Sequence, residues 1–189
     1  MRKINLIFVL LIFSSNMFVY AYENYMHVPD NLLLKQIHEV KLMNIGEIKE
    51  EVYEDEPEDL IVPMNWMLIY PNGHFISLHV ENGVIETLVI TDSFFKTKKN
   101  IRVGDNLEKI ISIDSGAEFE GGSSEVVNVN SLLGVVLYSK DKKIIYRFEY
   151  DKEIVSAMLH KEKIYTVKDK KIKSLKLWGM YIKASSWEK

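Results

Sequence analysis

The side chains that could carry out chemistry are scattered along this 189-residue chain. His38 and Glu39 begin like the His-Glu-x-x-His motif of a zinc protease, but Leu42 stands where the second histidine must be. Because zinc needs both histidines on one helical face, we expect no metal site there. His74 and His79 are five residues apart in strand-like sequence, so they point to opposite faces and are typical of surface or interstrand residues.

A nucleophilic site has no better support. The absence of cysteine excludes thiol nucleophiles and cysteine metal sites. Ser123 and Ser124 follow Gly121-Gly122 without a nucleophile elbow, and neither a phosphate loop nor a dinucleotide fingerprint occurs. Carboxylates are plentiful, but their spacing singles out no pair. We therefore expect no catalytic residue, no cofactor and no metal. A hydrolase remains an alternative, because catalytic groups need only be close in space.

Aromatic residues near the C-terminus suggest a binding surface instead. Tyr181 and Trp187 follow Gly179 and lie close in sequence to Lys183 and Lys189. Large rings beside cations are common at protein interfaces, so Tyr181 and Trp187 are the candidate partner-binding residues. In the alternative interpretation, this tail packs its rings back onto the sheet.

The first half of the chain predicts a helix followed by a meander. Apolar spacing indicates a helix from about Asn31 to Met43, capped by Asp30 or Asn31. The acid-rich segment from Glu47 to Asp59 is expected to be an exposed loop. Asn-Gly turns then separate alternating apolar runs. The predicted strands are Trp66–Tyr70, His74–Val80 and Val84–Thr91.

The second half predicts the same order of elements. A short helix is expected from Gly104-Asp105 through Ile113, followed by a glycine-bearing loop from Gly116 to Ser124. Both Trp66 and Trp178 lie in strand-like runs and are expected in the core. The predicted strands here are Glu125–Val129, Leu133–Tyr138, Ile144–Tyr150, Ile154–His160, Ile164–Val167 and Ile172–Trp178.

The segment from Ser93 to Ile110, strongest from Phe94, carries a recognisable pattern, with Phe-x-Thr followed by Ile-x-Val-Gly-Asp and a helix. It resembles small exported bacterial proteins of the β-lactamase-inhibitor-protein-like and outer-membrane-assembly lipoprotein superfamily. Gly104 permits a close turn, Asp105 is expected to cap the helix, and Thr97 to bond local backbone. Asn100 replaces the usual glycine, and Ile113–Gly116 replaces the usual aromatic-glycine helix end. The resemblance implies architecture and a binding role, with no catalytic residue.

These elements indicate an α+β fold of short helices on antiparallel meanders. Asp-Asn-Leu opens both predicted helices, at Asp30–Leu32 and at Asp105–Leu107, which suggests two related helix-plus-sheet modules. The expected divisions are residues 22–92, with helix, acidic loop and three-stranded meander, and residues 93–189, with short helix and C-terminal meander. We expect 22–189 to form one compact unit.

Residues 1–21 predict an export signal. Arg2 and Lys3 precede an apolar run from Ile4 to Phe13, and Val19-Tyr20-Ala21 suits signal peptidase. The alternative, an uncleaved anchor, fits poorly, because Ser14 to Asn16 interrupt the run before the length that spans a bilayer. Without cysteine no lipid can be attached at the cleavage site. We expect a periplasmic or secreted protein with no stable membrane anchor.

Charge is distributed unevenly along the remaining chain. Residues 22–189 hold 22 basic and 27 acidic residues, a net charge of −5, which gives no nucleic-acid footprint. Residues 22–60 carry a net −8 and residues 139–189 a net +7. This asymmetry could steer a charged partner, or it could reflect ordinary solvated surface.

The sequence therefore predicts a non-catalytic protein-binding module. An inhibitor or immunity factor against a secreted or periplasmic enzyme is its most concrete form. The alternative is a structural or assembly component of the cell envelope, with a hydrolase as the second alternative. The sequence leaves the partner protein and the oligomeric state open.

Overall fold

The computed structural model describes residues 27–50, 66–130 and 133–185. All strand pairs are antiparallel, and the strand order is β1-β2-β3-β4-β9-β8-β7-β5, with β6 paired to β7. This arrangement confirms the α+β fold with an antiparallel sheet. In chain order the elements are η1 (Asp30–Leu32), α2 (Ile37–Leu42), β1 (Glu47–Glu50), β2 (Trp66–Ile69), β3 (Phe75–Glu81), β4 (Val84–Ile90), α3 (Leu107–Ile113), β5 (Glu118–Phe119), β6 (Val129–Asn130), β7 (Gly134–Tyr138), β8 (Ile144–Phe148), α4 (Lys152–Leu159), α5 (Lys170–Lys173) and β9 (Leu177–Lys183).

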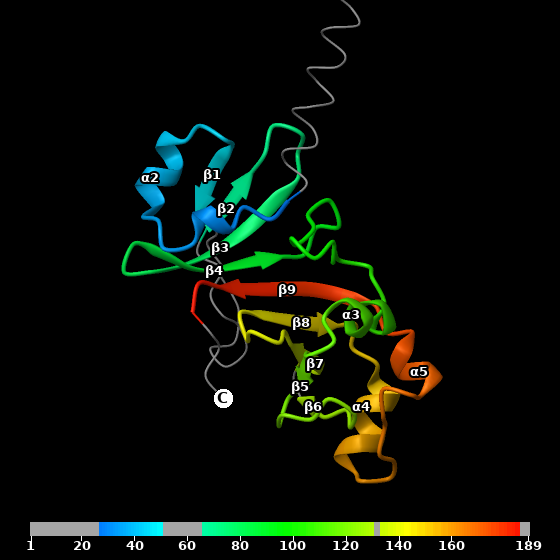
Figure 1. Ribbon diagram of the computed structural model, residues 1–189. Helices are drawn as coiled ribbons and strands as arrows, with labels where there is room; N and C mark the ends of the chain where they lie inside the picture. The colour runs from blue at the N-terminus through cyan, green and yellow to red at the C-terminus, as the bar shows by residue number, and fades with distance from the viewer. Residues whose placement is uncertain (1–26, 51–65, 131–132, 186–189) are drawn as a thin grey trace, which may run out of the picture.

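The sheet consists of two meanders joined at the centre (Figure 1). Strands β1 to β4 make the first, β5, β7, β8 and β9 make the second, and β4 pairs with β9 across the seam. Helix α2 precedes the first meander and α3 the second, whereas α4 and α5 lie between β8 and β9 in the chain. Within the described ranges, no helix has the length and apolar character needed to cross a membrane.

The chain before α2 is tied to the beginning of β4 by three backbone hydrogen bonds. Leu34 N donates to Ile85 O (2.9 Å), and Ile85 N donates to Lys35 O (2.9 Å). Ile37 N donates to Gly83 O (3.1 Å). Leu34 has a left-handed backbone, with φ 64°. These bonds fix where α2 begins relative to the sheet.

The chain before α3 is tied to the beginning of β9 in the same way. Gly104 N donates to Leu177 O (2.8 Å), and Leu177 N donates to Asp105 O (2.8 Å). Leu107 N donates to Leu175 O (3.0 Å). Gly104 is also left-handed, with φ 90°. The same three bonds therefore occur in both halves, with a leucine in the first where the second has glycine.

Strand register repeats as well. The β3–β4 pairing skips Glu86, which follows Ile85, the β4 residue bonded to the chain before α2. The β8–β9 pairing skips Trp178, which follows Leu177, the β9 residue bonded to the chain before α3. At the seam Val89 pairs with Tyr181, and each holds the same place in its own half. The described backbone thus contains one plan twice, related by an approximate two-fold axis through this pair.

The sequence match Asp-Asn-Leu aligns the wrong residues of the two halves. Asp30–Leu32 forms η1. By the hydrogen-bond pattern, the residues of the first half that are equivalent to Asp105–Leu107 are Lys35–Ile37. Gln36 and Asn106 are the N-cap residues of α2 and α3. The two halves are therefore related by their backbone pairing, and the Asp-Asn-Leu match does not mark equivalent positions.

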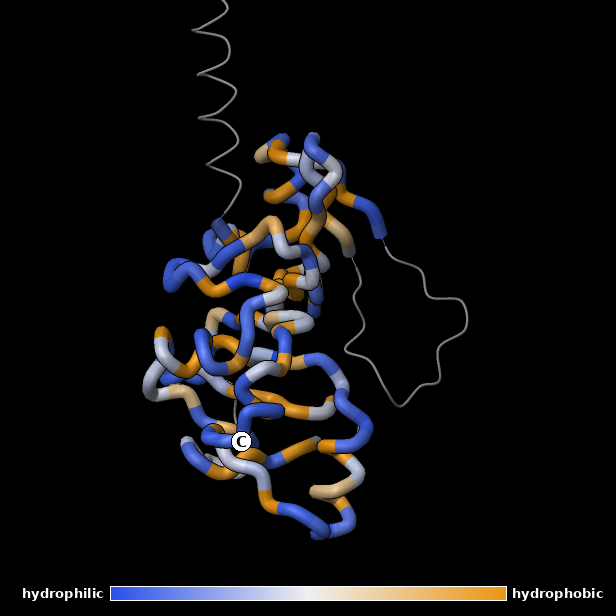
Figure 2. Tube along the Cα trace, turned by 90° about the vertical axis from the view of Figure 1, so that its right-hand side faces the viewer, coloured by the Kyte–Doolittle hydropathy of each residue, from blue (hydrophilic) through white to orange (hydrophobic). Residues whose placement is uncertain are grey.

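One face of the sheet and the helices share a single apolar core. Its buried members come from strands of both meanders and from every described helix, and hydrophobic segments run through the middle of the molecule (Figure 2). Burial of side chains this large contributes about 1.5–3 kcal/mol each, so this core is the main stabilising element. The helical members are Leu32, Val40, Leu107, Ile110, Ile154 and Ile172.

The predicted helix from Asn31 to Met43 is wrong in its first half. Instead the chain forms η1, breaks around Leu34, and re-enters helix at Ile37. The break occurs because residues 34–37 form backbone hydrogen bonds with the start of β4 and the turn before it, instead of helical hydrogen bonds within their own segment. The predicted acidic loop also needs correction, since Glu47–Glu50 is β1, paired with β2. Its remainder, residues 51–59, lies outside the described residues.

In the second half, three predicted strands are wrong. Residues 154–159 lie in α4, which ends before His160. Asp151 caps this helix by accepting a hydrogen bond from Ile154 N (3.0 Å). Ile172–Trp178 is divided between α5 and the start of β9. Ile164–Val167 contributes one isolated bridge, from Thr166. Ile154, Val155 and Ile172, which suggested strands, are buried on helices instead.

Other predictions hold with small changes of boundary. The hairpins β2–β3 and β3–β4, the strands β7 and β8, and helix α3 all form where the sequence placed them. The predicted strand Glu125–Val129 is wrong except at Val129, which begins β6. The predicted loop Gly116–Ser124 contains the short β5. Asn-Gly and alternating apolar residues were therefore reliable local signals.

Candidate functional site

The motif from Phe94 to Ile110 builds a structural joint. Thr97 N donates to Ile101 O (2.8 Å), and the Thr97 hydroxyl accepts from Ile101 N (3.2 Å), which confirms that Thr97 bonds local backbone. Asn100 takes a left-handed conformation, φ 59°, in the position where glycine is usual. Asparagine tolerates that conformation, so the turn forms without a glycine.

Gly104 and Asp105 complete the joint, but the cap lies one residue later than predicted. Asn106 caps α3 by accepting a hydrogen bond from Lys109 N (2.9 Å). Asp105 instead accepts from Arg102 N (3.0 Å) and pairs with the Lys109 ammonium (2.7 Å). Its carboxylate therefore closes the turn before the helix. These contacts assign the motif an architectural role.

A buried polar network lies next to this joint. The Asp114 side chain is only 1% exposed, and its oxygens contact Lys99 Nζ (2.8 Å) and the Tyr146 hydroxyl (3.2 Å). Burial, and then the Asp114 charge, raise the pKa of Tyr146 far above its usual value. Tyr146 thus stays protonated, and able to donate this hydrogen bond, above the pH at which an exposed tyrosine ionises. The network connects the 97–100 turn, the end of α3 and strand β8.

A cluster of cation and aromatic side chains lies on the sheet face opposite the core. Arg147 from β8 places its guanidinium carbon 4.8 Å from the ring centre of Trp178, and its Nη1 donates to the Tyr181 hydroxyl (3.3 Å). The strand neighbours Tyr146 and Met180 are buried in the core, so alternation points Arg147 and Tyr181 the other way. We call Arg147, Trp178 and Tyr181 the aromatic–cation cluster.

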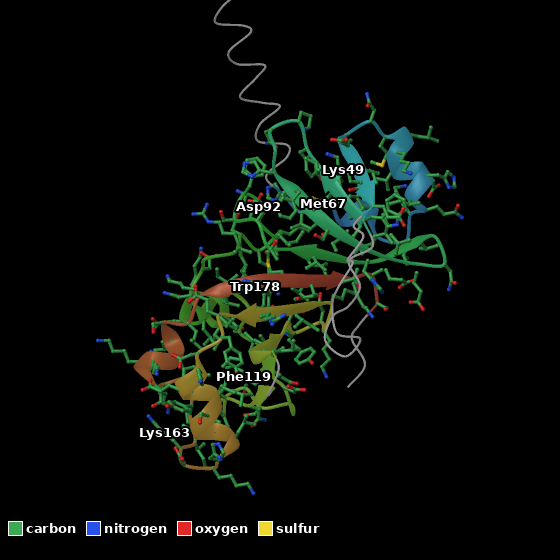
Figure 3. All side chains as sticks on the ribbon, turned by 180° about the vertical axis from the view of Figure 1, so that it is seen from behind. Lys49, Met67, Asp92, Phe119, Lys163 and Trp178 are labelled. Atoms are coloured by element: carbon green, nitrogen blue, oxygen red, sulfur yellow. The ribbon has the colours of Figure 1, made fainter. Side chains whose placement is uncertain are left out.

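Two expectations about these rings need correction. Tyr181 lies in the central strand β9, paired with Val89 and Ile145, not in a tail after Gly179. Trp178, expected in the core, is 44% exposed because the register shift at this point leaves it outside the ladder (Figure 3). Trp66 is partly buried and packs against the core. Trp187 lies outside the described residues.

On the same face of the sheet, part of β3 and β4 is buried. Ser77, Thr87 and Val89, on β3 and β4, are all buried although they point away from the core cluster. The Thr87 hydroxyl is buried and has no hydrogen-bond partner among the described residues. The aromatic–cation cluster thus lies next to a buried part of this face. The sequence singled out Tyr181, but it did not predict the contact between Tyr181 and Arg147, which is 34 residues away.

A histidine–carboxylate pair lies where β3 begins and β4 ends. His74 Nδ1 is 2.8 Å from Asp92 Oδ2, and the Phe94 ring stacks on the imidazole at 3.9 Å. Asp92, labelled in Figure 3, also accepts from Phe94 N (2.9 Å). A carboxylate that holds an imidazole can orient a general base. Here the pair joins β3 to the turn after β4, and Phe95 lies edge-on to the ring.

In the described ranges 27–50, 66–130 and 133–185, no three histidine or acidic side chains converge as metal ligands. Comparisons with family models, curated proteins and solved structures find no match. The resemblance of the Phe94–Ile110 segment to the inhibitor-like superfamily therefore stays a prediction.

Proposed function

We propose that this protein is an exported, non-catalytic protein-binding module that acts as an inhibitor or immunity factor against a secreted or periplasmic enzyme. The observation that carries the proposal is the exposed Trp178, stacked with Arg147 beside Tyr181 on two central strands. The export signal pattern in residues 1–21 supports the location. In this proposal, the aromatic–cation cluster is the anchor of the contact surface.

Trp, Tyr and Arg are the residue types that most often dominate binding energy at interfaces. Here the cation–π contact and the hydrogen bond already fix Arg147 and both rings before any partner arrives. Such preorganisation lowers the entropy lost on association. The two strands that carry the cluster are hydrogen-bonded on both sides, by β4 and by β7, so the backbone beneath is held in place.

Charge supports an acidic partner surface. The region from Ser139 to Lys189 carries a net +7, and the cluster lies within it. Positive potential on one partner accelerates association with a negative surface and disfavours basic competitors. An enzyme whose active-site rim is acidic would fit this surface.

The test is capture of a partner by the protein recovered from cells that express the full chain. Trp178→Ala should lower affinity for the captured protein about 30-fold, the effect of losing a contact worth about 2 kcal/mol. Tyr150→Ala is the matched control, because Tyr150 is also a large exposed ring, 52% exposed. Recovery of no partner, or equal effects of the two variants, would contradict the proposal.

A further inference from the structure

A cleft of about 510 Å³ opens at one end of the sheet, beside the seam between the two meanders. Its walls come from the chain after η1, the 97–99 turn, the β7–β8 turn and the end of β9. Apolar side chains form much of the lining, namely Leu33, Leu34, Ile144 and Ile182. The volume is in the range of small-molecule sites.

Leu34 is the feature of this cleft that folding does not explain. Its backbone is left-handed, φ 64°, which is rare for a leucine. Its side chain is 63% exposed and lines the cleft. The other half of the molecule carries Gly104 at the same place in the hydrogen-bond pattern, φ 90°. Glycine meets this backbone requirement without strain, so the leucine is kept at a cost to stability.

An exposed apolar side chain on a strained backbone is typical of a functional position. In the unliganded protein Leu34 gains little from burial, because 63% of the residue is exposed. A ligand with an apolar body would cover it together with Leu33 and Ile144. Coverage of that surface by a ligand supplies the favourable burial that the free protein lacks.

The polar part of the lining favours an anion. Four lysines, at positions 98, 99, 143 and 183, contribute to the walls, against the carboxylates of Asp30 and Asp141. Lys98 pairs with Asp30 (2.8 Å), and Lys99 pairs with Asp114 (2.8 Å) behind the wall. With Asp114 included, ammonium groups still outnumber carboxylates. The balance attracts negative charge.

We propose that the cleft binds a small amphipathic carboxylate, with its apolar chain against Leu33, Leu34 and Ile144 and its carboxylate among the lysines. The site is separate from the aromatic–cation cluster, so either proposal can fail without the other. A free aliphatic acid supplies both the apolar chain and the negative charge, and an acyl ester with a phosphate headgroup presents the same pairing of apolar chain and anion.

The test is calorimetric titration of the purified full chain with decanoate below its micelle concentration. We expect saturable binding of one decanoate, and at least tenfold weaker binding of acetate, which lacks the apolar chain, and of decyltrimethylammonium, which reverses the charge. A decanoyl ester of glycerol phosphate distinguishes the acyl part of a larger anion from the free acid. No saturable binding of either decanoyl compound, or equal binding of decanoate and the cation, would overturn the proposal.

Variants at position 34 separate ligand binding from folding. Leu34→Gly should weaken decanoate binding about tenfold, the effect of losing one buried leucine contact, and should not lower the melting temperature. Leu34→Ala should weaken binding equally and melt below Leu34→Gly, because alanine retains the backbone strain. Asn82→Gly, at a left-handed turn residue that does not line the cleft, should leave binding unchanged. Unchanged binding by both position-34 variants would refute the assignment.

Discussion

Removal of the Lys99 ammonium should destabilise the protein far more than removal of its neighbour Lys98. Lys99 is the charged partner of the Asp114 carboxylate, which is 1% exposed and otherwise receives a hydrogen bond from Tyr146. Lys99→Met would leave that charge buried beside a single hydroxyl donor. Breaking a fully buried pair from one side costs about 3–5 kcal/mol.

Lys99 itself is 46% exposed, so water already screens part of the attraction, and the expected cost is smaller. We expect about 2–3 kcal/mol for Lys99→Met. In a chain of this size that loss corresponds to a fall in melting temperature of roughly 5–10 °C. Urea denaturation should show a lower midpoint with an unchanged slope, since the core surface exposed on unfolding is the same.

Lys98→Met is the matched control. Lys98 is 81% exposed and pairs with Asp30, itself 40% exposed, and such a surface pair contributes about 0–1 kcal/mol. The double variant Lys99→Met/Asp114→Asn should recover stability relative to Lys99→Met, because the amide is neutral and can still accept from Tyr146. Equal losses from Lys98→Met and Lys99→Met would refute the buried-charge reasoning.

Three further perturbations test other parts of the structure. Thr87→Val should stabilise the protein by about 1 kcal/mol in urea titration, because the Thr87 hydroxyl is buried without a described partner; a loss of stability would contradict this. The pKa of Tyr146 is raised in the folded state, so its contribution is complete below the unfolded value near pH 10 and is lost as pH rises above it; Tyr146→Phe should show a shallower alkaline fall in the free energy of unfolding than wild type. Asp151→Ala should cost about 1 kcal/mol and reduce amide-exchange protection in α4, because Asp151 caps that helix, while Glu149→Ala, outside the helix, should leave α4 protection unchanged.

The sequence predicted the local hairpins well because their signals are local. Asn82-Gly83 takes the paired left-handed conformations of a tight turn, φ 51° and 80°, and alternating apolar residues fixed the faces of β3 and β4. The short helix α3 was recognisable from its apolar spacing for the same reason. In these segments, near neighbours in the chain decide the structure.

The failures arise where distant residues decide the backbone. The helix breaks at Leu34 because that residue pairs with Ile85, 51 positions later, which no helical spacing could reveal. Ile154 and Val155 are β-branched but bury themselves as one side of α4. Likewise Trp178 looks like a core residue in sequence and is exposed by a register shift against β8.

The candidate site was only partly predictable. Tyr181 stood out as an aromatic residue near lysines, but its partners Arg147 and Trp178 are joined to it only through strand pairing and a bulge. The contact between His74 and Asp92 is separated by 18 residues and has no sequence signature. Strand register decides which side chains are neighbours across a sheet, and the sequence of a single strand does not determine that register.

The central position of β9 has a consequence for how the molecule is made. Residues 177–183 are the last strand of the chain, yet they lie between β4 and β8 in the middle of the sheet. Until they emerge, β4 and β8 each present an open edge, and the two halves cannot join through strand pairing. Pairings between such distant segments form slowly, so the two half-sheets join only after β9 is available. A chain truncated before Leu177 would be left with two unjoined half-sheets and open edges that can pair with other chains, so the joining of the two halves depends on β9.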